Sequence, residues 1–477
     1  MPYDLLLEIF RMNANMFADD GALDTARTTS QVCRSWRNIM LMTPSIWAKL
    51  IDLDCVQRLL LNKWRNELIR RSGSSLLWIK AKKLGQINPA HYLVNFLFDV
   101  LHQHWGRIQI LVADVYGKDI HPIQYAPLSL PAPHLETFDL NIGAGGLDTS
   151  TLFSRQAPML RRFTSQRNHV DITAPWLHQL HFIEFPWGNT TLPVLSVTQN
   201  LRELKIHRSK IRHATLPLPT VTLPNLRRLD ICLDLRYVAS ILDNLEIPRN
   251  CSLNIYTWST LTAYDDLWPV LDTVAQAAQH YFHSYPPTNI LFQLSDERLT
   301  LEDSMHPDKF SLIIGFYRLF HIPNVPVCFV DKLQTMAKFS GVKELTFYAK
   351  DLPPLDFLSF INCFSSVQTI RTSEQNIQYL ISIQAQESDD PRSVQGGCKN
   401  IFPNLSTVIL TAEPDQRTCH IGKVTTNFIL SRIQHGQPLS VLNLTQAVSV
   451  ELTALDLLRD IAGLEVLMNT DGNVKFI

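Results

Sequence analysis

The sequence has little glycine, with 17 residues in a chain of 477. Glycine-rich loops let backbone N–H groups approach phosphates, and neither G-x-G-x-x-G nor G-x-x-x-x-G-K-[ST] occurs. The G-x-S-x-G turn of hydrolases and the zinc-binding H-E-x-x-H motif are also missing. We therefore predict no catalytic residues, no bound metal and no cofactor.

Long apolar runs and paired cysteines are lacking too. No segment reaches the roughly 18 apolar residues that cross a membrane. Asp4 and Glu8 interrupt the apolar N-terminus, which is unlike a signal peptide. The eight cysteines include no C-x-x-C pair, as is typical of reduced thiols in intracellular proteins. We expect a soluble cytoplasmic or nuclear protein without a membrane partner.

Neither sign of charge dominates. The net charge is −1, which argues against nucleic acid or an anionic membrane as the partner. Apolar residues make up 45% of the chain and charged residues 18%. This balance predicts a folded protein with a large core, long enough for several domains.

The sequence does have a helical, apolar segment at its N-terminus. The spacing predicts a helix over residues 3–12, because Leu5, Ile9 and Met12 recur on one face. Leu6 and Phe10 form an adjoining row on the same helix.

A second helix with two apolar faces is expected after residue 22. It should end at Thr43, because the residue before Pro44 is disfavoured in the α region, and Trp47 then falls in a short third helix or turn. Three short helices are too few to bury a core alone. We expect their apolar side chains to need a partner, or else to pack as a small cap on the rest of the chain.

The order and spacing of these residues resemble the F-box, a motif of Glu-Ile-Phe, then Val-Cys-basic-x-Trp, then Pro-x-x-Trp. The matching positions, which the resemblance assigns to adaptor binding, are Pro2, Leu5, Leu6, Ile9, Phe10, Val32, Cys33, Trp36 and Trp47. The resemblance implies a Skp-type adaptor and a cullin as partners, within an SCF-type (cullin–RING) ubiquitin ligase. An F-box protein catalyses nothing itself and contributes by holding a target protein near the ubiquitin-charged enzyme.

Residues 1–54 would thus be an F-box domain, and residues 55–120 a connecting region. Helices at 56–71 and 91–105 are expected to alternate with strands at 75–80 and 107–112. This order also resembles the segment after the F-box in a large fungal class of F-box proteins. His102 and His104 point to different faces of their helix, so no metal is expected there.

After residue 120 a short unit recurs, with the pattern Pro-x-Leu-x-x-Leu/Phe-x-apolar. Its copies are residues 133–140, 158–163, 175–182, 200–206, 224–231, 342–347, 367–370, 405–410, 439–444 and 464–467. The first leucines of the first five copies are 25, 17, 24 and 25 residues apart, close to the period of leucine-rich repeats.

We therefore predict an α/β fold: a small three-helix F-box, then an irregular leucine-rich-repeat solenoid over residues 121–477 with a parallel β-sheet on its concave side. An ordinary α/β domain with leucine-rich strands is the alternative. An insert near residues 261–310, with a long helix at 261–285 and an acidic, polar stretch at 296–308, would be a lid or the meeting point of two half-arrays. Residues 386–400 are expected to form an exposed loop.

The function expected from these patterns is that of a non-enzymatic substrate receptor for an unknown protein target. Candidate substrate-facing residues, chosen by their register on the concave strands, are Glu203, Lys205, Arg228, Asp230, Glu344 and Tyr348. Two alternatives stay open. One is an F-box/leucine-rich-repeat scaffold not linked to degradation, and the other is a hydrolase or transferase with a helical N-terminal cap.

Overall fold

A computed structural model gives the fold. It describes residues 2–56, 62–84, 91–115, 120–142, 149–165, 170–208, 219–259, 264–295, 298–316, 329–330, 332–333, 339–349, 358–389, 401–412, 420–446, 449–450, 458, 461–470 and 473–476. The chain divides into two compact units, Met1–Leu226 and Arg227–Ile477. This boundary lies inside the predicted repeat region, and none was expected there from the sequence. Most of the predicted loop at 386–400 lies outside the described residues.

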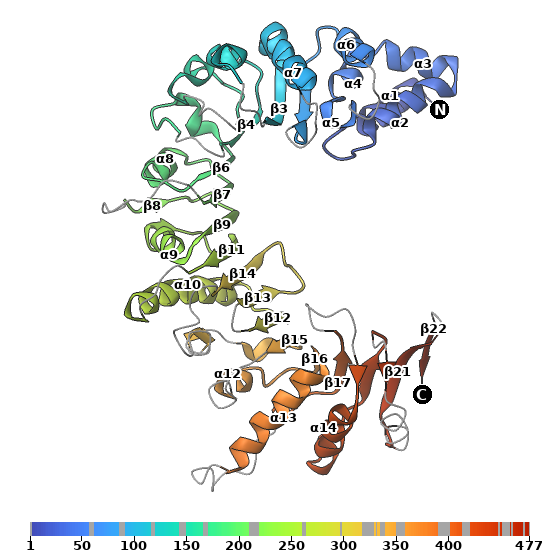
Figure 1. The fold of residues 1–477 in the computed structure, drawn as a ribbon, viewed down its shortest axis with the longest axis vertical. Helices are drawn as coiled ribbons and strands as arrows, with labels where there is room; N and C mark the ends of the chain where they lie inside the picture. The colour runs from blue at the N-terminus through green and yellow to red at the C-terminus, as the bar shows by residue number, and fades with distance from the viewer. Residues whose placement is uncertain are drawn as a thin grey trace. The chain divides into compact units, whose positions relative to one another are not determined.

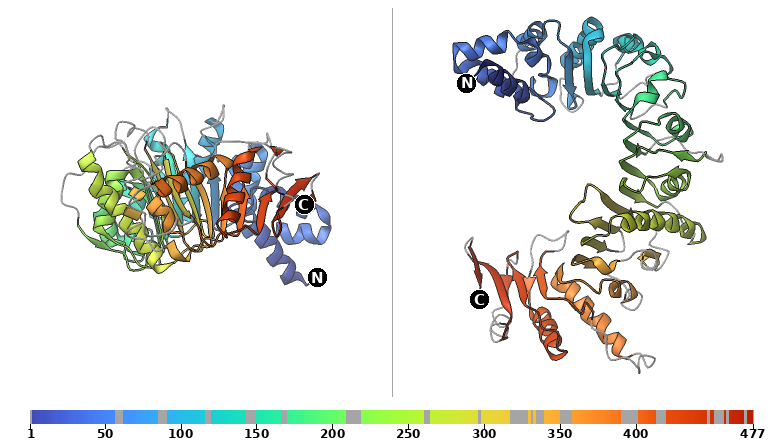
Figure 2. Two further views of the ribbon diagram at one scale, coloured as in Figure 1. Left: turned by 90° about the horizontal axis from the view of Figure 1, so that it is seen from below. Right: turned by 180° about the vertical axis from the view of Figure 1, so that it is seen from behind.

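The first unit begins with four helices between residues 3 and 48, where three were predicted. They are α1 (Tyr3–Asn13), α2 (Ala22–Val32), α3 (Arg34–Leu41) and α4 (Pro44–Ala48), and α1 carries the N-terminus (Figure 2). The predicted second helix is broken at Cys33, which has an extended backbone (φ −154°, ψ 169°). The Cys33 Sγ accepts a hydrogen bond from Trp36 N (3.4 Å) and so caps α3. Pro44 starts α4, where its missing N–H costs nothing.

Parallel strands follow in chain order. They are β1 (Ile51–Asp52), β2 (Leu77–Ala81), β3 (Ile108–Val115), β4 (Thr137–Ile142), β5 (Arg162–Thr164), β6 (Phe182–Pro186) and β7 (Glu203–His207), each paired with the next. Parallel pairs need crossover connections. Those with helices are α5 (Leu53–Val56), α6 (Asn62–Arg71), α7 (His91–His104) and α8 (Thr191–Val197). Figure 1 shows α7 and α8 on the same side of their strands.

The second unit has a mostly parallel sheet. Its parallel strands are β9 (Arg228–Asp234), β11 (Ser252–Trp258), β15 (Glu344–Ala349), β16 (Thr369–Thr372), β17 (Thr407–Leu410), β19 (Val441–Leu444) and β21 (Glu465–Thr470). Its helices are α9 (Leu235–Asn244), α10 (Tyr264–Ser284), α12 (Leu358–Asn362), α13 (Glu374–Asp389) and α14 (Lys423–Gln434). These helices lie along one side of the strands (Figure 1). The last strand, β22 (Asn473–Phe476), is antiparallel to β21.

An antiparallel three-stranded insert interrupts the parallel order of the second unit. Its strands are β12 (Asn289–Leu294), β13 (Arg298–Asp303) and β14 (Phe310–Gly315). At its two edges, β14 pairs with β11 and β12 pairs with β15. The chain must therefore advance three strand positions after β11, about 14 Å. α10, with 21 residues, is long enough to do so. Residues 298–303 were expected to be part of a polar stretch, but they are a strand of this insert.

Each of the ten predicted repeat copies overlaps or adjoins a strand, but the predicted register is wrong in two of them. Strand pairing places Ile183 opposite Leu204 and Val466 opposite Leu442, so these residues, and not Leu180 and Leu467, occupy the second apolar position of their copies. In β7, Leu204 and Ile206 are buried, whereas Glu203, Lys205 and His207 are partly exposed. Apolar side chains thus face the helices, and polar ones line the opposite face of the sheet. Both units are α/β, and no helix among the described residues is both long enough and apolar enough to span a bilayer.

One side-chain contact recurs just before three of these strands. Asn200, Asn225 and Asn404 each precede the first leucine of a copy. Their side-chain amides donate to backbone oxygens of the preceding segment, at His178 (2.8 Å), Gln199 (3.0 Å) and Ser365 (2.9 Å). The same residue type therefore satisfies an equivalent carbonyl in both units.

Candidate partner-binding surface

The N-terminal helices enclose a small hydrophobic core of their own. It consists of Leu6, Phe10, Ala14, Met16, Ala22, Leu23, Ala26, Ile39, Met40, Ile46, Trp47 and Leu50, completed by Leu68 of α6. Trp47 is fully buried, and its Nε1 donates to the Met40 carbonyl (2.7 Å). The Arg71 guanidinium of α6 lies 4.6 Å from the Trp47 ring. This core fixes the helices without any outside partner.

The structure therefore separates the nine predicted adaptor-binding residues into two groups. Leu6, Phe10 and Trp47 are core residues that the chain's own side chains cover, and their assignment to adaptor binding stays a prediction. Pro2, Leu5, Val32 and Cys33 are exposed, and Ile9 and Trp36 are partly buried. Trp36 packs edge-on against Phe10, with ring centroids 5.2 Å apart.

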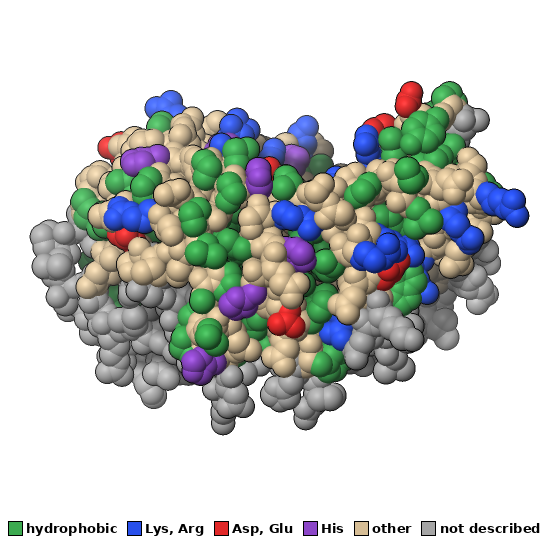
Figure 3. Space-filling model, turned by 90° about the horizontal axis from the view of Figure 1, so that it is seen from above, with side chains coloured by type: hydrophobic (Ala, Val, Ile, Leu, Met, Phe, Trp, Pro, Cys, Tyr) green, Lys and Arg blue, Asp and Glu red, His purple; other side chains and the backbone are tan. Residues whose placement is uncertain are grey.

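An apolar surface remains uncovered on this module, and we call it the helical patch. Its large side chains, each more than 40% exposed, are Tyr3, Leu5, Met12, Val32, Leu41 and Met42. Leu5 and Met12 belong to one of the two apolar rows predicted for α1, and the other row, with Leu6 and Phe10, faces inward. In Figure 3 the projecting part at the upper right, which carries α1, shows hydrophobic side chains beside charged ones.

Several residues of the helical patch were not in the predicted set. Met12 shares a face with Leu5, a signal that the i, i+7 spacing already contained. Leu41 and Met42 come at the end of α3, just before the turn at Thr43. Their exposure follows from the break at Cys33, which turns α3 relative to the single helix expected from the sequence.

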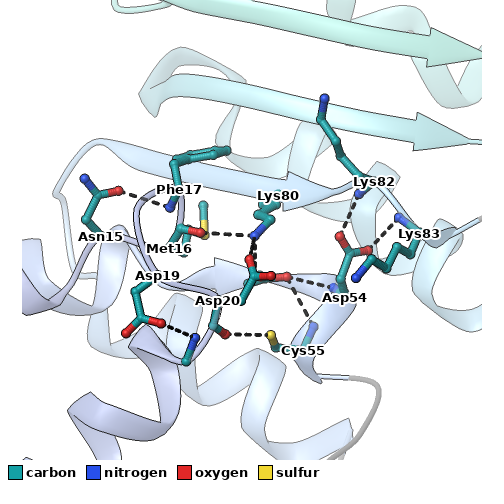
Figure 4. Close-up of polar contacts among 12 residues, drawn as sticks. Asn15, Met16, Phe17, Asp19, Asp20, Asp54, Cys55, Lys80, Lys82 and Lys83 are labelled. Atoms are coloured by element: carbon teal, nitrogen blue, oxygen red, sulfur yellow. Dashed lines mark hydrogen bonds and ion pairs between the residues drawn. The ribbon is translucent and has the colours of Figure 1, made fainter. Parts of the chain in front are cut away.

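Polar contacts attach the N-terminal helices to the sheet (Figure 4). The Lys80 ammonium on β2 contacts Asp20 Oδ1 (2.5 Å), Asp52 Oδ2 (3.3 Å) and the Met16 carbonyl (3.1 Å). Burial lowers the pKa of Lys80, but the contacts with Asp20 and Asp52 outweigh it, so the pKa is raised. Asp52 is 1% exposed, so Lys80 neutralises a buried charge.

A second carboxylate and an aromatic contact strengthen this attachment. Asp54 accepts hydrogen bonds from the backbone N–H groups of Lys82 (2.9 Å) and Lys83 (2.8 Å), as Figure 4 shows. Burial nevertheless raises the pKa of the Asp54 carboxyl. Phe17 lies against Trp78 of β2, with ring centroids 6.0 Å apart. The helices and the first strands of this unit therefore form one continuous structure, without a free linker at residue 54.

The six predicted substrate-facing residues all lie on the polar face of a strand, and all are partly exposed. Glu203 and Lys205 are on β7, Arg228 and Asp230 on β9, and Glu344 and Tyr348 on β15. Glu203 and Lys205 belong to the first unit, and the other four residues belong to the second.

Each of these residues is held by neighbours in its own unit. Arg228 Nε donates to both oxygens of Asp230 (3.0 Å each). Glu344 accepts from Asn289 Nδ2 (2.8 Å), and the Tyr348 hydroxyl is 2.6 Å from Thr411 Oγ1. Such mutual pairing leaves a surface of mixed charge with ordered side chains.

The same face of the first unit carries a charged group that the sequence did not single out. Lys82 contacts Asp139 (3.1 Å). Burial, and then the charge of Asp139, raise the pKa of Asp114.

The described residues contain no group of three or more histidine, cysteine or acidic side chains placed to hold a metal ion. The described cysteines, Cys33, Cys55, Cys232, Cys251 and Cys363, are free thiols.

Comparisons with known proteins add no assignment. No protein-family model matches the chain, and no curated protein has a significantly similar sequence.

Proposed function

We propose that this chain is the substrate-recognition subunit of an SCF-type (cullin–RING) E3 ubiquitin ligase. The helical patch would bind the Skp-type adaptor, and the polar face of the strands would bind the target protein. The chain would catalyse nothing itself and would act by proximity.

The observation that carries the proposal is the exposure of Leu5 and Val32 on helices that already have a complete core. Each is more than half exposed. Burying an exposed leucine or valine side chain contributes about 1.5–3 kcal/mol, so several such residues together can hold a partner helix. We attribute the outward position of these side chains to the one-residue break at Cys33, between α2 and α3, and to the two apolar rows of α1.

The repeat part of the proposal is supported by the recurrent geometry of the strands. Parallel pairing in chain order and helices on one face are properties of leucine-rich-repeat arrays. The repeated asparagine contact at residues 200, 225 and 404 adds a side chain that plays one role in several copies. Such a surface suits a receptor, because the residues between the buried apolar positions of each strand can vary without disturbing the core.

The test is binding of a purified Skp-type adaptor to the full chain, measured by calorimetry. We expect the double variant Leu5→Glu/Val32→Glu to weaken binding at least about thirtyfold, because two anchors become charged. The matched control is Leu130→Glu/Met159→Glu, since both side chains are also exposed but lie outside the N-terminal helices. Circular dichroism should show that both variants stay folded.

The proposal fails if wild type does not bind the adaptor, or if the two double variants bind equally well. Co-purification of a cullin with the adaptor-bound chain is expected of a ligase subunit. An adaptor complex that never recruits a cullin would indicate a scaffold that does not promote ubiquitination.

A further inference from the structure

Three basic residues of the first unit lie side by side where parallel strands begin, and we call them the basic row: Arg161, His181 and Arg202. Each directly precedes its strand, β5, β6 or β7. Backbone hydrogen bonds fix the row, because His181 N donates to the Arg161 carbonyl (2.8 Å) and Arg202 N donates to the His181 carbonyl (2.8 Å). Figure 1 shows β6 and β7 as neighbours. Successive residues of the row are therefore one strand spacing apart at the backbone, about 4.8 Å.

The two arginines of the basic row form no ion pair with a carboxylate among the residues that the structure describes. Arg161 is partly exposed, and its Nη1 donates to the backbone carbonyls of Pro158 (3.4 Å) and Leu160 (3.1 Å). Arg202 is exposed to solvent. Carbonyl contacts leave the charge of a guanidinium in place, so both arginines can still attract an anion.

Carboxylates close to the row in sequence or register are held elsewhere. Glu203 pairs with Arg162 (Oε2 to Nη2, 3.7 Å), whose guanidinium also lies 3.9 Å from the Phe182 ring. Glu136, in the equivalent position before β4, accepts a hydrogen bond from Gln109 Nε2 (2.8 Å). The described part of this surface therefore does not neutralise the two arginine charges of the row.

The imidazole between the two arginines is affected by both of their charges. Burial lowers the pKa of His181, and the charges of Arg202 and then Arg161 lower it further. Both guanidiniums are therefore close enough to act on one ring, and the ring is neutral at pH 7. A neutral imidazole still has one N–H group that can donate to an anion. An anion at the row would thus meet two cations and a further hydrogen-bond donor.

We propose that the basic row binds an acidic segment of a protein, with carboxylate side chains about three residues apart on Arg161 and Arg202. The two arginines are two strand spacings apart, about 10 Å, which an extended chain covers in about three residues. Each guanidinium can bind a carboxylate through two parallel hydrogen bonds. The row adjoins Glu203 and Lys205 of β7, so, resting on the proposed function, the bound protein is the target.

The experiment measures binding of a fluorescent peptide to the full chain by anisotropy. The peptide has about twelve residues, with glutamate at every third position and serine elsewhere, and its control has glutamine for glutamate. We expect Arg161→Glu/Arg202→Glu to raise the Kd of the glutamate peptide at least about thirtyfold, because two attractive contacts become repulsive. The matched control, Arg34→Glu/Arg37→Glu, makes the same change in net charge at two exposed arginines of α3, and should raise the Kd less than about threefold.

The inference is overturned if the glutamate peptide binds wild type no better than the glutamine peptide, or if the two double variants weaken binding equally. A phosphoserine peptide of the same spacing should bind within about tenfold of the glutamate peptide, because the guanidinium fork fits both groups. Much tighter binding of that peptide, or of a single-stranded DNA of similar charge, would overturn the assignment to an acidic protein segment. If the row's double variant does not fold, Arg202→Gln decides alone, with an expected rise in Kd of about fivefold.

Adaptor binding separates this inference from the proposed function. By calorimetry, Arg161→Glu/Arg202→Glu should bind the Skp-type adaptor as wild type does, because both residues lie outside the helical patch. A chain that binds the adaptor but not the glutamate peptide refutes the inference about the basic row alone. A chain that binds the glutamate peptide but not the adaptor refutes the receptor function, and the basic row stays a binding surface.

Discussion

The N-terminal helices and the strands that follow them differ in the apolar side chains they leave in solvent. Seven of the 17 large, exposed apolar side chains among the described residues are in residues 2–56, namely Tyr3, Leu5, Met12, Phe17, Val32, Leu41 and Met42. The strands instead alternate buried apolar and partly exposed polar residues, as β15 does.

This difference follows from the two periodicities. A strand has two faces, so a sheet covered by helices on one face needs polar residues only on the other. A helix such as α1 can carry two adjoining apolar rows, and a core of four short helices covers only one of them. The helical module therefore has a closed core of its own but leaves large apolar side chains exposed on its surface. The sheet has its apolar side chains buried and polar side chains on its open face, which suits polar contacts with a partner.

The strongest test of this comparison is Trp47→Ala. Removing a fully buried ring from the core of the helices should lower the free energy of unfolding by about 3–5 kcal/mol, measured by urea denaturation and circular dichroism. Met42→Ala is the control, because Met42 is 79% exposed and its loss should cost less than about 0.5 kcal/mol. Equal losses would mean that buried and exposed apolar residues of the helices are not distinct.

A slightly smaller effect is expected at the attachment between helices and sheet. Lys80→Met should lower the free energy of unfolding by about 3 kcal/mol, because it leaves the buried Asp52 carboxylate without a cation. Adding Asp52→Asn should restore part of the loss. Asp20→Asn alone should cost less than about 1 kcal/mol, since the Asp20 side chain is 79% exposed. A loss in Asp20→Asn as large as in Lys80→Met would contradict this assignment.

On the polar face of the sheet, Tyr348→Phe should lower the free energy of unfolding by about 1 kcal/mol. It removes the hydroxyl that lies 2.6 Å from Thr411 Oγ1, across β15, β16 and β17. A double-mutant cycle with Thr411→Val should show that the two losses are not additive. Simple additivity would indicate that this hydroxyl pair is not coupled.

The smallest effect is a pH dependence from α6. Hydrogen bonds from Arg70, and then Arg71, hold the pKa of Glu67 at about 2, below the usual value of about 4.3. The depressed pKa stabilises the folded state above pH 4.3, and this stabilisation is lost as pH falls toward 2. The urea midpoint should therefore fall less between pH 5 and pH 3 in Glu67→Gln than in wild type. An equal decrease of the urea midpoint in wild type and variant would show that Glu67 has the same pKa in the folded and unfolded states.

Much of the fold could be predicted, because apolar periodicity is a local property. The strand at 203–207 and the helix at 91–104 follow from spacing alone. The insert of β12, β13 and β14 could not be predicted in the same way. The pairing of β14 with β11 depends on where α10 returns the chain, which is a property of the whole sheet.

The candidate surface was predicted only in part, for a related reason. The sequence identified which rows of α1 are apolar, but not which row faces the core. Trp47 and Val32 look equally suited to binding in the sequence. Only the three-dimensional packing shows that the first is enclosed by Met40 and Arg71 and the second is not. The break at Cys33 depends on a thiol acting as a helix cap, a role that serine or aspartate usually fills.

The three-stranded insert also sets the distance between two positions on the polar face that we propose as the target-binding surface. Asp230 on β9 and Thr346 on β15 lie in one row across the sheet, through Asn254, Ser311, Glu302 and Leu291. Five strand spacings separate them, about 24 Å. An extended peptide needs about seven residues to reach from one to the other. A target that contacts both positions must therefore present either a long, open segment or a folded surface of that width, and a shorter recognition sequence would reach only one.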